Sequence, residues 1–248
     1  LPWNVAATEF LQFKGEKASK SKKIGIWMHE ALELFPADYW RYFLMATRPE
    51  TKDSNFSRRI FIEKTNADLN DTFGNFIHRT LTFIDTQFNS EIPEIQSLDS
   101  DSQAILKSLE EKVETVAEQL ENCELQSAIT TVMGIARTGN QYLNEKEPWK
   151  LIKTDKTKAA NILRVAAQYV KALAIVSAPF IPLSAQEIWK TLNLPGSVHE
   201  QEWNEALRRL PRNHKIGKPK PLFRKIDSDE KELEEKLQNV RRILAVAS

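Results

Sequence analysis

The stretch from residue 156 to residue 177 constrains the fold most, because its apolar residues recur at steps of three and four positions. That spacing predicts an α-helix. A helix that is apolar around most of its circumference needs neighbours on several sides. We therefore predict that this helix lies at the centre of a helical bundle. Its predicted core positions are Ala159, Ile162, Leu163, Ala166, Val170, Leu173 and Val176.

Further amphipathic segments can supply the neighbours of this central helix. Helices are predicted for residues 25–47 with an interruption at Pro36, and for residues 57–88, 102–120, 125–143, 184–191 and 233–247. Ser57 can cap the helix of residues 57–88, and Ser184 with Glu187 predicts a capping box for the helix of residues 184–191. Only 7 of the 248 residues are glycine, which suits long helices. The predicted fold is mainly α, an antiparallel helical bundle preceded by a short mixed segment.

Charge and cysteine content bound the possible functions. The net charge is only +1, but residues 208–225 carry eight basic side chains and no acidic one. Such a stretch either contacts phosphates or forms a solvated surface strap. The single cysteine, Cys123, excludes an internal disulfide, and four scattered histidines predict no metal site. This composition indicates a cytoplasmic protein, and no run approaches the ~20 apolar residues of a membrane span.

A short basic loop precedes the first predicted helix. It reads Lys14-Gly15-Glu16-Lys17-Ala18-Ser19-Lys20-Ser21-Lys22-Lys23, with five lysines and one glutamate. Ammonium and hydroxyl groups can bind a polyphosphate and compensate its charge when it leaves. Taken alone, the loop leaves the alternative of a solvated surface segment open.

Four groups of residues, taken together and in order, resemble the methionyl-tRNA synthetase family of class I aminoacyl-tRNA synthetases. They are the lysine loop followed by Ala37-Asp38-Tyr39-Trp40-Arg41-Tyr42-Phe43-Leu44, then Asn66-Ala67-Asp68-Leu69-Asn70 with Gly74-Asn75-Phe76-Ile77-His78-Arg79, then Asn140-Gln141-Tyr142 with Glu147-Pro148-Trp149, and finally Leu222-Phe223-Arg224-Lys225-Ile226. The loop is similar to the family's KMSKS loop, although Ala18 replaces the usual methionine or phenylalanine. The segment from Asn4-Val5 through Phe10-Leu11-Gln12-Phe13-Lys14-Gly15-Glu16-Lys17 also looks like the family strand that leads into this loop, so the resemblance spans residues 4–226.

The resemblance implies two domains. Residues 1–54 would be the end of the catalytic domain with its KMSKS-type loop, and residues 55–248 would be the α-helical anticodon-binding domain with a C-terminal helix. The family's H-I-G-H segment, methionine pocket and zinc knuckle would lie upstream of Leu1. We therefore expect the C-terminal part of such an enzyme, which is inactive alone and has the missing N-terminal catalytic half as a partner. Zinc is expected only in that half, and this part alone is expected to bind no cofactor.

The resemblance also implies a reaction. The complete enzyme would activate methionine with ATP, accompanied by Mg²⁺, and transfer it to initiator and elongator tRNA(Met). Lys17 and Lys20 would be the catalytic residues, and Lys20, Ser19 and Ser21 would bind the ATP phosphates. Lys20 would stabilise charge that develops on the leaving pyrophosphate.

The anticodon would be bound elsewhere in the chain. Single-stranded RNA is recognised by aromatic rings that stack on bases and by polar groups that bond base edges. Asn75 and Arg79 are four residues apart and share a helix face, and Pro148 can present the ring of Trp149. By resemblance, these four residues would bind the CAU anticodon. The alternatives are a core tryptophan, a locally bonded asparagine and an arginine in a surface ion pair.

Two other functions remain to be separated from this one. A synthetase for leucine, isoleucine or valine would share the lysine loop, and a non-catalytic helical interaction module would share the bundle. Solvent exposure of Trp149 on the same end of the bundle as Asn75 and Arg79 discriminates among them. Asp38 and Arg41 are expected to be structural, as an i, i+3 pair that fixes the junction of the two domains.

Overall fold

Helix α8 (Lys156–Ser177) runs through the centre of the molecule, and every residue from Ile162 to Ser177 is buried. The computed structural model describes residues 5–13, 15–19, 21–22, 24–94, 98–211 and 214–247. The predicted bounds and central position of this helix are confirmed. Among the described residues, one helix, α8, is long and apolar enough to cross a membrane. However, 89% of its most apolar 18-residue stretch is buried inside the fold. It is therefore a core helix.

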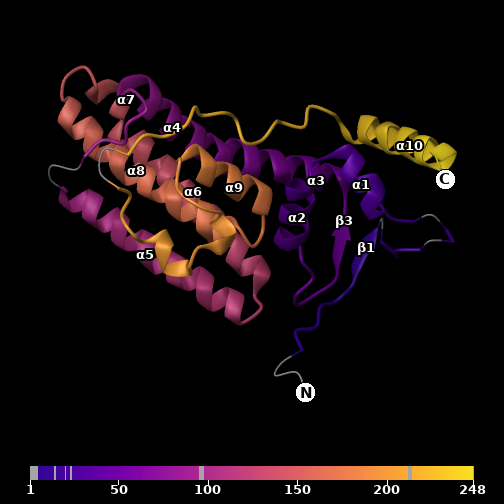
Figure 1. Cartoon of the computed structure of the whole chain (residues 1–248). Coiled ribbons are helices and arrows are strands. Elements are labelled where there is room, and N and C mark those ends of the chain that lie inside the picture. The colour runs from indigo at the N-terminus through magenta and orange to yellow at the C-terminus, as the bar shows by residue number, and fades with distance from the viewer. Residues whose placement is uncertain are drawn as a thin grey trace.

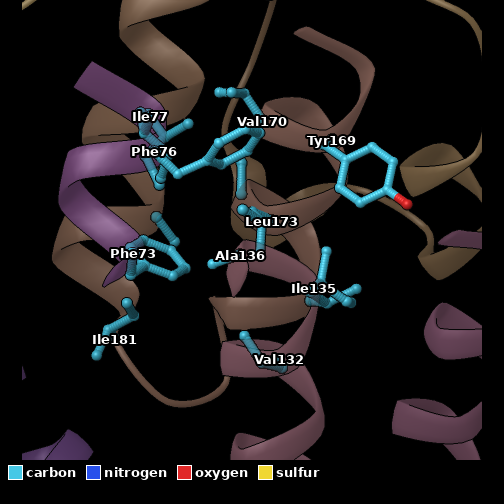
Figure 2. Packing of buried hydrophobic residues seen from close by; sticks show 14 of the residues in the cluster. Phe73, Phe76, Ile77, Val132, Ile135, Ala136, Tyr169, Val170, Leu173 and Ile181 are labelled. Carbon is cyan, nitrogen blue, oxygen red and sulfur yellow. The ribbon is translucent and has the colours of Figure 1, made fainter. Parts of the chain in front are cut away.

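Helical segments on several sides pack around α8. They include α5 (Ser100–Glu121), α6 (Leu125–Lys146), α9 (Pro182–Thr191) and the run that ends in α4 (Asn75–Gln87). Figure 2 shows Phe76 of α4, Ala136 of α6 and Val170 of α8 meeting in the core. A Cβ atom added to Gly139 would lie 2.5 Å from the buried ring of Phe76. A glycine at this position therefore lets α6 approach α4 closely.

The helix predicted for residues 57–88 is a composite. It begins at Ser57, whose hydroxyl caps α3 (Arg58–Thr65), continues as the π-helical segment η1 (Asn66–Gly74) and ends as α4. A π segment widens the turn and disturbs the regular backbone ladder. Asn140 of α6 compensates, because its side-chain amide donates to the Thr72 carbonyl at 2.9 Å. The extent of the helix was predicted correctly, and its π segment was not predicted.

The capping box predicted at Ser184 is wrong. Helix α9 (Pro182–Thr191) begins with Pro182, so Ser184 lies inside its first turn. The Asp38 carboxylate accepts hydrogen bonds there from the Ser184 N–H at 2.6 Å and from the Ser184 hydroxyl at 2.7 Å. Arg41 donates to the carbonyls of Pro179 and Phe180 at 2.8 and 3.0 Å. Both residues fix the junction as expected, but each holds the segment before or within α9 rather than pairing with the other.

The N-terminal segment carries a small sheet in the order β2-β1-β3. Strand β1 (Leu11–Phe13) pairs antiparallel with β2 (Glu16–Lys17) and parallel with β3 (Ser54–Phe56). Helices α1 (Met28–Leu34) and α2 (Ala37–Ala46) lie between β2 and β3 in the chain. This is the short mixed segment that the sequence predicts.

The remaining elements lead from the bundle back to the sheet. After α9 come two 3₁₀ turns, η2 (Val198–Glu200) and η3 (Trp203–Ala206), and then an extended segment, residues 214–226, which we call the strap. The strap ends at helix α10 (Glu230–Ala247), which packs on α1 and α3. Figure 1 shows α10 beside the sheet and the short helix α7 (Pro148–Leu151) at the opposite end of the molecule.

Candidate nucleic-acid interface

The break between α6 and α7 presents an aromatic ring to solvent. Glu147 adopts the left-handed conformation, with φ of 44°, and its N–H closes α6 on the Leu143 carbonyl at 3.0 Å. Pro148 then begins α7, where its fixed φ suits the first turn of a helix. Pro148 is buried, whereas Trp149 is 37% exposed. The tryptophan therefore does not close the core, which was the alternative for this residue.

Arg79 of α4 lies against this ring. Its guanidinium carbon is 5.2 Å from the centre of the Trp149 ring, within the range of a cation–π contact. Its Nη2 atom also donates to the side-chain oxygen of Asn144 at 3.1 Å. Both partners are uncharged, so they orient the guanidinium without neutralising it. Asn144 lies on the last turns of α6 and was not predicted from the sequence as a site residue.

Asn75 lies one helical turn before Arg79 on α4 and is exposed. It lines a hollow of about 330 Å³ together with Asn70, His78 and residues 221–223 of the strap. A second hollow of about 240 Å³ is lined by Arg79, Pro148 and Trp149, and His78 lines it as well. The two hollows thus adjoin. We call the surface formed by Asn75, His78, Arg79, Asn144 and Trp149 the α4/α7 face.

Contacts with Gly74, Tyr39 and Asn66 hold residues 223–226 of the strap in place. Phe223 packs on Gly74, where an added Cβ atom would lie 3.1 Å from the Phe223 ring. The Tyr39 hydroxyl donates to the Arg224 carbonyl at 2.9 Å and accepts from the Arg224 N–H at 2.8 Å. The Asn66 side-chain amide makes the same pair of bonds with Ile226, at 2.9 and 2.8 Å. The wall of the Asn75 hollow is therefore fixed.

The basic stretch of residues 208–225 is partly paired with acidic groups. Arg208 lies 3.1 Å from Glu205, and Lys225 lies 3.9 Å from Asp71. Lys218 and Lys220 are exposed on the strap, while Arg212 lies outside the described residues. The exposed lysines agree with the expected surface strap, and the expected phosphate contact stays a prediction.

Residues 15–19 and 21–22 of the lysine loop are among the described residues. The backbones of Ser19 and Ile24 exchange two hydrogen bonds of 2.9 Å, which close a short turn. Within this turn the hydroxyls of Ser19 and Ser21 are 3.2 Å apart. The Lys17 ammonium lies over the Phe10 ring, 4.2 Å from its centre. Ser19 and Ser21 are therefore brought together, whereas Lys20, the other predicted catalytic lysine, lies outside the described residues.

The structure does not bring the loop and the α4/α7 face together. The loop extends from the sheet at one end of the molecule, and α7 lies at the other end (Figure 1). Within the described residues, no three His, Cys, Asp or Glu side chains are grouped closely enough to hold a metal ion. The chain therefore offers two separate surfaces, one with a cationic and hydroxyl-rich loop and one with an aromatic ring, an amide and a guanidinium.

Comparison with known proteins identifies the family. Residues 92–242 match the family model described as the anticodon binding domain of methionyl tRNA ligase. The chain belongs to this family. Residues 1–81 also match the model of class I tRNA synthetases of the methionine type. The family match separates the chain from the leucine, isoleucine and valine enzymes and from a helical interaction module unrelated to tRNA.

Curated relatives carry the same family name. The chain is 41% identical over 230 residues to methionine–tRNA ligase of Aeropyrum pernix, and 39% identical over 242 residues to that of Thermofilum pendens. These alignments cover 92% and 97% of this chain but only 40% and 42% of the relatives. The chain thus spans about two fifths of the length of these methionyl-tRNA ligases.

Solved structures show the same fold. Mycobacterium tuberculosis methionyl-tRNA synthetase matches in its free form with a TM-score of 0.80 and 21% identity, over 90% of this chain and 44% of that one. The structure of the same enzyme in complex with methionyl-adenylate matches with a TM-score of 0.81 and 23% identity, over 88% and 43%. The predicted fold class, a helical bundle after a short mixed segment, is therefore confirmed.

Proposed function

We propose that this chain is the tRNA-binding part of a methionine–tRNA ligase and that the α4/α7 face binds the CAU anticodon of tRNA(Met). One observation carries the proposal most directly. Arg79 holds its guanidinium over the exposed ring of Trp149, within a chain that belongs to the anticodon-binding family. An oriented ring beside an unneutralised cation suits an unstacked base and its phosphate.

Each residue of the proposed site has a distinct role. Trp149 stacks on one base, and buried Pro148 fixes the backbone that presents the ring. Asn75 offers a donor and an acceptor to a base edge at the adjoining hollow of about 330 Å³. Arg79 supplies a planar fork of donors, which binds a base edge or a phosphate more specifically than a lysine ammonium does.

The lysine loop has the second role in this proposal. In the complete enzyme the methionine carboxylate attacks the α-phosphate of ATP, pyrophosphate leaves, and methionyl-adenylate forms. A hydroxyl of the terminal adenosine of the tRNA then attacks the methionyl carbonyl, and AMP leaves. Lys17 and Lys20 stabilise the phosphate charge in the first step, and the adjacent hydroxyls of Ser19 and Ser21 bind phosphate oxygens. ATP enters as its Mg²⁺ complex.

The two roles divide the chain as the sequence suggests. Residues 1–54 serve the ATP-dependent step and residues 55–248 serve anticodon binding. Methionine binds in the N-terminal catalytic half of the enzyme, which also holds any zinc, and the enzyme works in the cytoplasm. The present chain alone is inactive in methionine-dependent exchange of pyrophosphate into ATP.

One experiment tests the anticodon site. The affinity for tRNA with a CAU anticodon is compared with the affinity for tRNA with an altered anticodon, in wild type, Trp149→Ala and Trp149→Phe. Loss of the ring should cost about 1–3 kcal/mol with the CAU tRNA only, the scale of one base–aromatic stack, and phenylalanine should restore much of it. An equal loss with both tRNAs would show that Trp149 supports the fold and not the anticodon.

A second experiment tests the loop. In the complete enzyme, Lys20→Ala should slow methionine-dependent pyrophosphate exchange by roughly 10²–10³-fold with little change in methionine binding, because the lysine meets charge that grows in the transition state. Lys22→Ala, two residues away in the same loop, is the matched control. An unchanged exchange rate in Lys20→Ala would overturn the role of the loop.

A further inference from the structure

The C-terminal helix is bonded to the base of the lysine loop. Arg241 of α10 donates through Nε to Glu30 Oε1 at 2.8 Å and through Nη2 to Glu30 Oε2 at 3.0 Å. The same Nη2 atom donates to the Gly25 carbonyl at 2.7 Å. One guanidinium thus joins residues that are 211 and 216 positions earlier in the chain. We call this contact the Arg241 clamp.

Glu30 is well suited to receive this arginine. Its side chain is buried, and its Oε2 atom also accepts from the Trp27 N–H at 2.9 Å. Burial alone would raise the pKa of Glu30, but the hydrogen bonds from Arg241 and Trp27 outweigh burial and lower this pKa below its ordinary value. The pair is therefore ionised at neutral pH and bonded at both carboxylate oxygens, which is the strong bidentate geometry.

Gly25 is the position at which the loop can turn. Ile24 is the second residue of the Ser19–Ile24 pair that closes the loop, and Gly25 follows it directly with φ of 132°, a conformation that other residues rarely adopt. The other side of the loop is held differently, because Lys17 pairs with Gln12 in the sheet. One side of the loop is thus fixed by strand pairing and the other by Arg241.

Apolar packing and an ion pair hold the first turns of α10. Leu233 and Leu237 are buried, and Arg58 lies 2.5 Å from Glu234. A hollow of about 400 Å³ beside these residues is lined by Gly25, Arg58, Glu234 and Arg241 among other residues. The directional bonds from Arg241 join the loop base to α10 beside this hollow.

We propose that Arg241 is a positioning residue for adenylate formation, which holds the base of the lysine loop in its working orientation through Gly25 and Glu30. This inference rests on the proposed function of the loop. It assigns the orientation of the loop to a residue that lies near the other end of the chain. Arg241 need not touch ATP. Its contribution is to keep the loop hydroxyls and ammonium groups where the phosphates bind, and small misplacements of such groups cost rate.

The test uses the complete enzyme with Arg241→Ala, Arg241→Lys and Arg242→Ala. Arg242 is the next residue on the same helix and is exposed, so it is the matched control. Arg241→Ala should lower kcat for pyrophosphate exchange by roughly 10- to 10²-fold with an unchanged KM for methionine, the scale for misplacing a catalytic group. Arg241→Lys should recover part of kcat, because an ammonium can bond Glu30 or Gly25 without the fork. Arg242→Ala should behave as wild type.

Hydrogen exchange of the Ile24 and Ser19 amides supplies a readout that is independent of activity. Both N–H groups close the loop, so Arg241→Ala should make them exchange faster while amides of α8 stay protected. Arg58→Ala, which removes the ion pair between Arg58 and Glu234 of α10, should leave kcat nearer to wild type. An equal loss of kcat in Arg58→Ala would mean that docking of α10 matters and the Arg241 clamp does not.

The outcomes separate this inference from the function on which it depends. If Lys20→Ala slows exchange and Arg241→Ala does not, the loop works in catalysis but Arg241 does not position it. If Lys20→Ala has no effect, the proposed function of the loop itself fails. Loss of Ile24 protection with full kcat would also overturn the proposal, since the loop orientation would then be irrelevant to rate.

Discussion

The carboxylate of Asp38 on α2 caps the first turn of α9 by accepting both the N–H and the hydroxyl of Ser184, at 2.6 and 2.7 Å. Asp38 and Ser184 are separated by 146 positions in the chain, so this cap also ties the junction helix to the bundle. Both partners are buried. A helix cap of this kind does the work that a local serine or aspartate usually does.

Asp38→Ala should therefore destabilise the chain. Removal of the carboxylate leaves a buried N–H and a buried hydroxyl without an acceptor, which costs about 1–3 kcal/mol for such a group. The free energy of unfolding in urea checks this, with Glu187→Ala on the exposed side of α9 as the control. A loss no larger than that of the control would show that water replaces Asp38.

Two glycines of α6 should respond to alanine in opposite directions. At Gly139 the new methyl group would lie 2.5 Å from the Phe76 ring, and at Gly134 nothing lies within 4 Å. Gly139→Ala should destabilise the bundle by about 1–3 kcal/mol through overpacking. Gly134→Ala should stabilise it by about 0.5–1 kcal/mol, because alanine is the better helix former. Thermal and urea unfolding of both variants measures the difference, and equal signs would contradict the packing argument.

Asn75→Ala should relax discrimination among anticodons. The change removes a donor and an acceptor beside a hollow of about 330 Å³, while Trp149 and Arg79 stay in place. The ratio of affinities for CAU and altered anticodons should fall by roughly 5- to 150-fold, the range for a lost edge contact of about 1–3 kcal/mol. Asn70→Ala, which removes the same group from the same hollow, is the control. A ratio unchanged by Asn75→Ala would remove this residue from base recognition.

Neutralising Lys218 and Lys220 should weaken the binding of all tRNAs alike. Both lysines are exposed on the strap, where they can contact phosphates but not a chosen base edge. Replacement of both with glutamine should reduce the slope of log affinity against log salt by roughly 0.7–0.9 for each lost phosphate contact. Lys107→Gln on the exposed face of α5 is the control. A loss confined to tRNA with the CAU anticodon would contradict this assignment.

The Arg241 clamp should make the free energy of unfolding depend on pH in the acidic range. The pKa of Glu30 is lowered in the folded chain from its ordinary value of 4.5. The unfolded chain therefore binds a proton first as the pH falls, so the clamp stabilises the fold above about pH 4.5 and this stability is lost as the pH falls through the folded pKa. Unfolding free energies from about pH 7 to pH 3 should show this loss in wild type and in Glu33→Gln, and a smaller loss in Glu30→Gln.

The features of the fold that depend on local interactions, such as helix bounds and helix faces, were predicted from local sequence patterns. The bounds of α8 were predicted from its periodicity, and in the structure the Asp155 side chain caps the helix by accepting from the Lys158 N–H at 2.9 Å. The same reasoning placed Asn75 and Arg79 on one face of α4. The strands are only two or three residues long, too short for an alternating pattern to reveal.

The features that were not predicted from the sequence depend on contacts between segments that are far apart in the chain. The π segment depends on Asn140, which is 68 positions from Thr72, and the cap of α9 depends on Asp38 instead of the nearby Ser184. Asn144 was not predicted because an asparagine near a helix end has no local signature of an arginine partner. The clamp of Arg241 on Gly25 spans nearly the whole chain, so no window of sequence could indicate it.

The π segment acts as an angular spacer between the two working surfaces. Asn66 at its start holds the strap near the sheet end, and Asn75 directly after its end belongs to the α4/α7 face. Deletion of one residue within the segment would tighten the wide turn towards an ordinary α-helix and change the rotation of α4 relative to α3. The number of residues in η1, which is nine, thus helps to set the direction in which Asn75 and Arg79, the residues proposed to bind the anticodon, face.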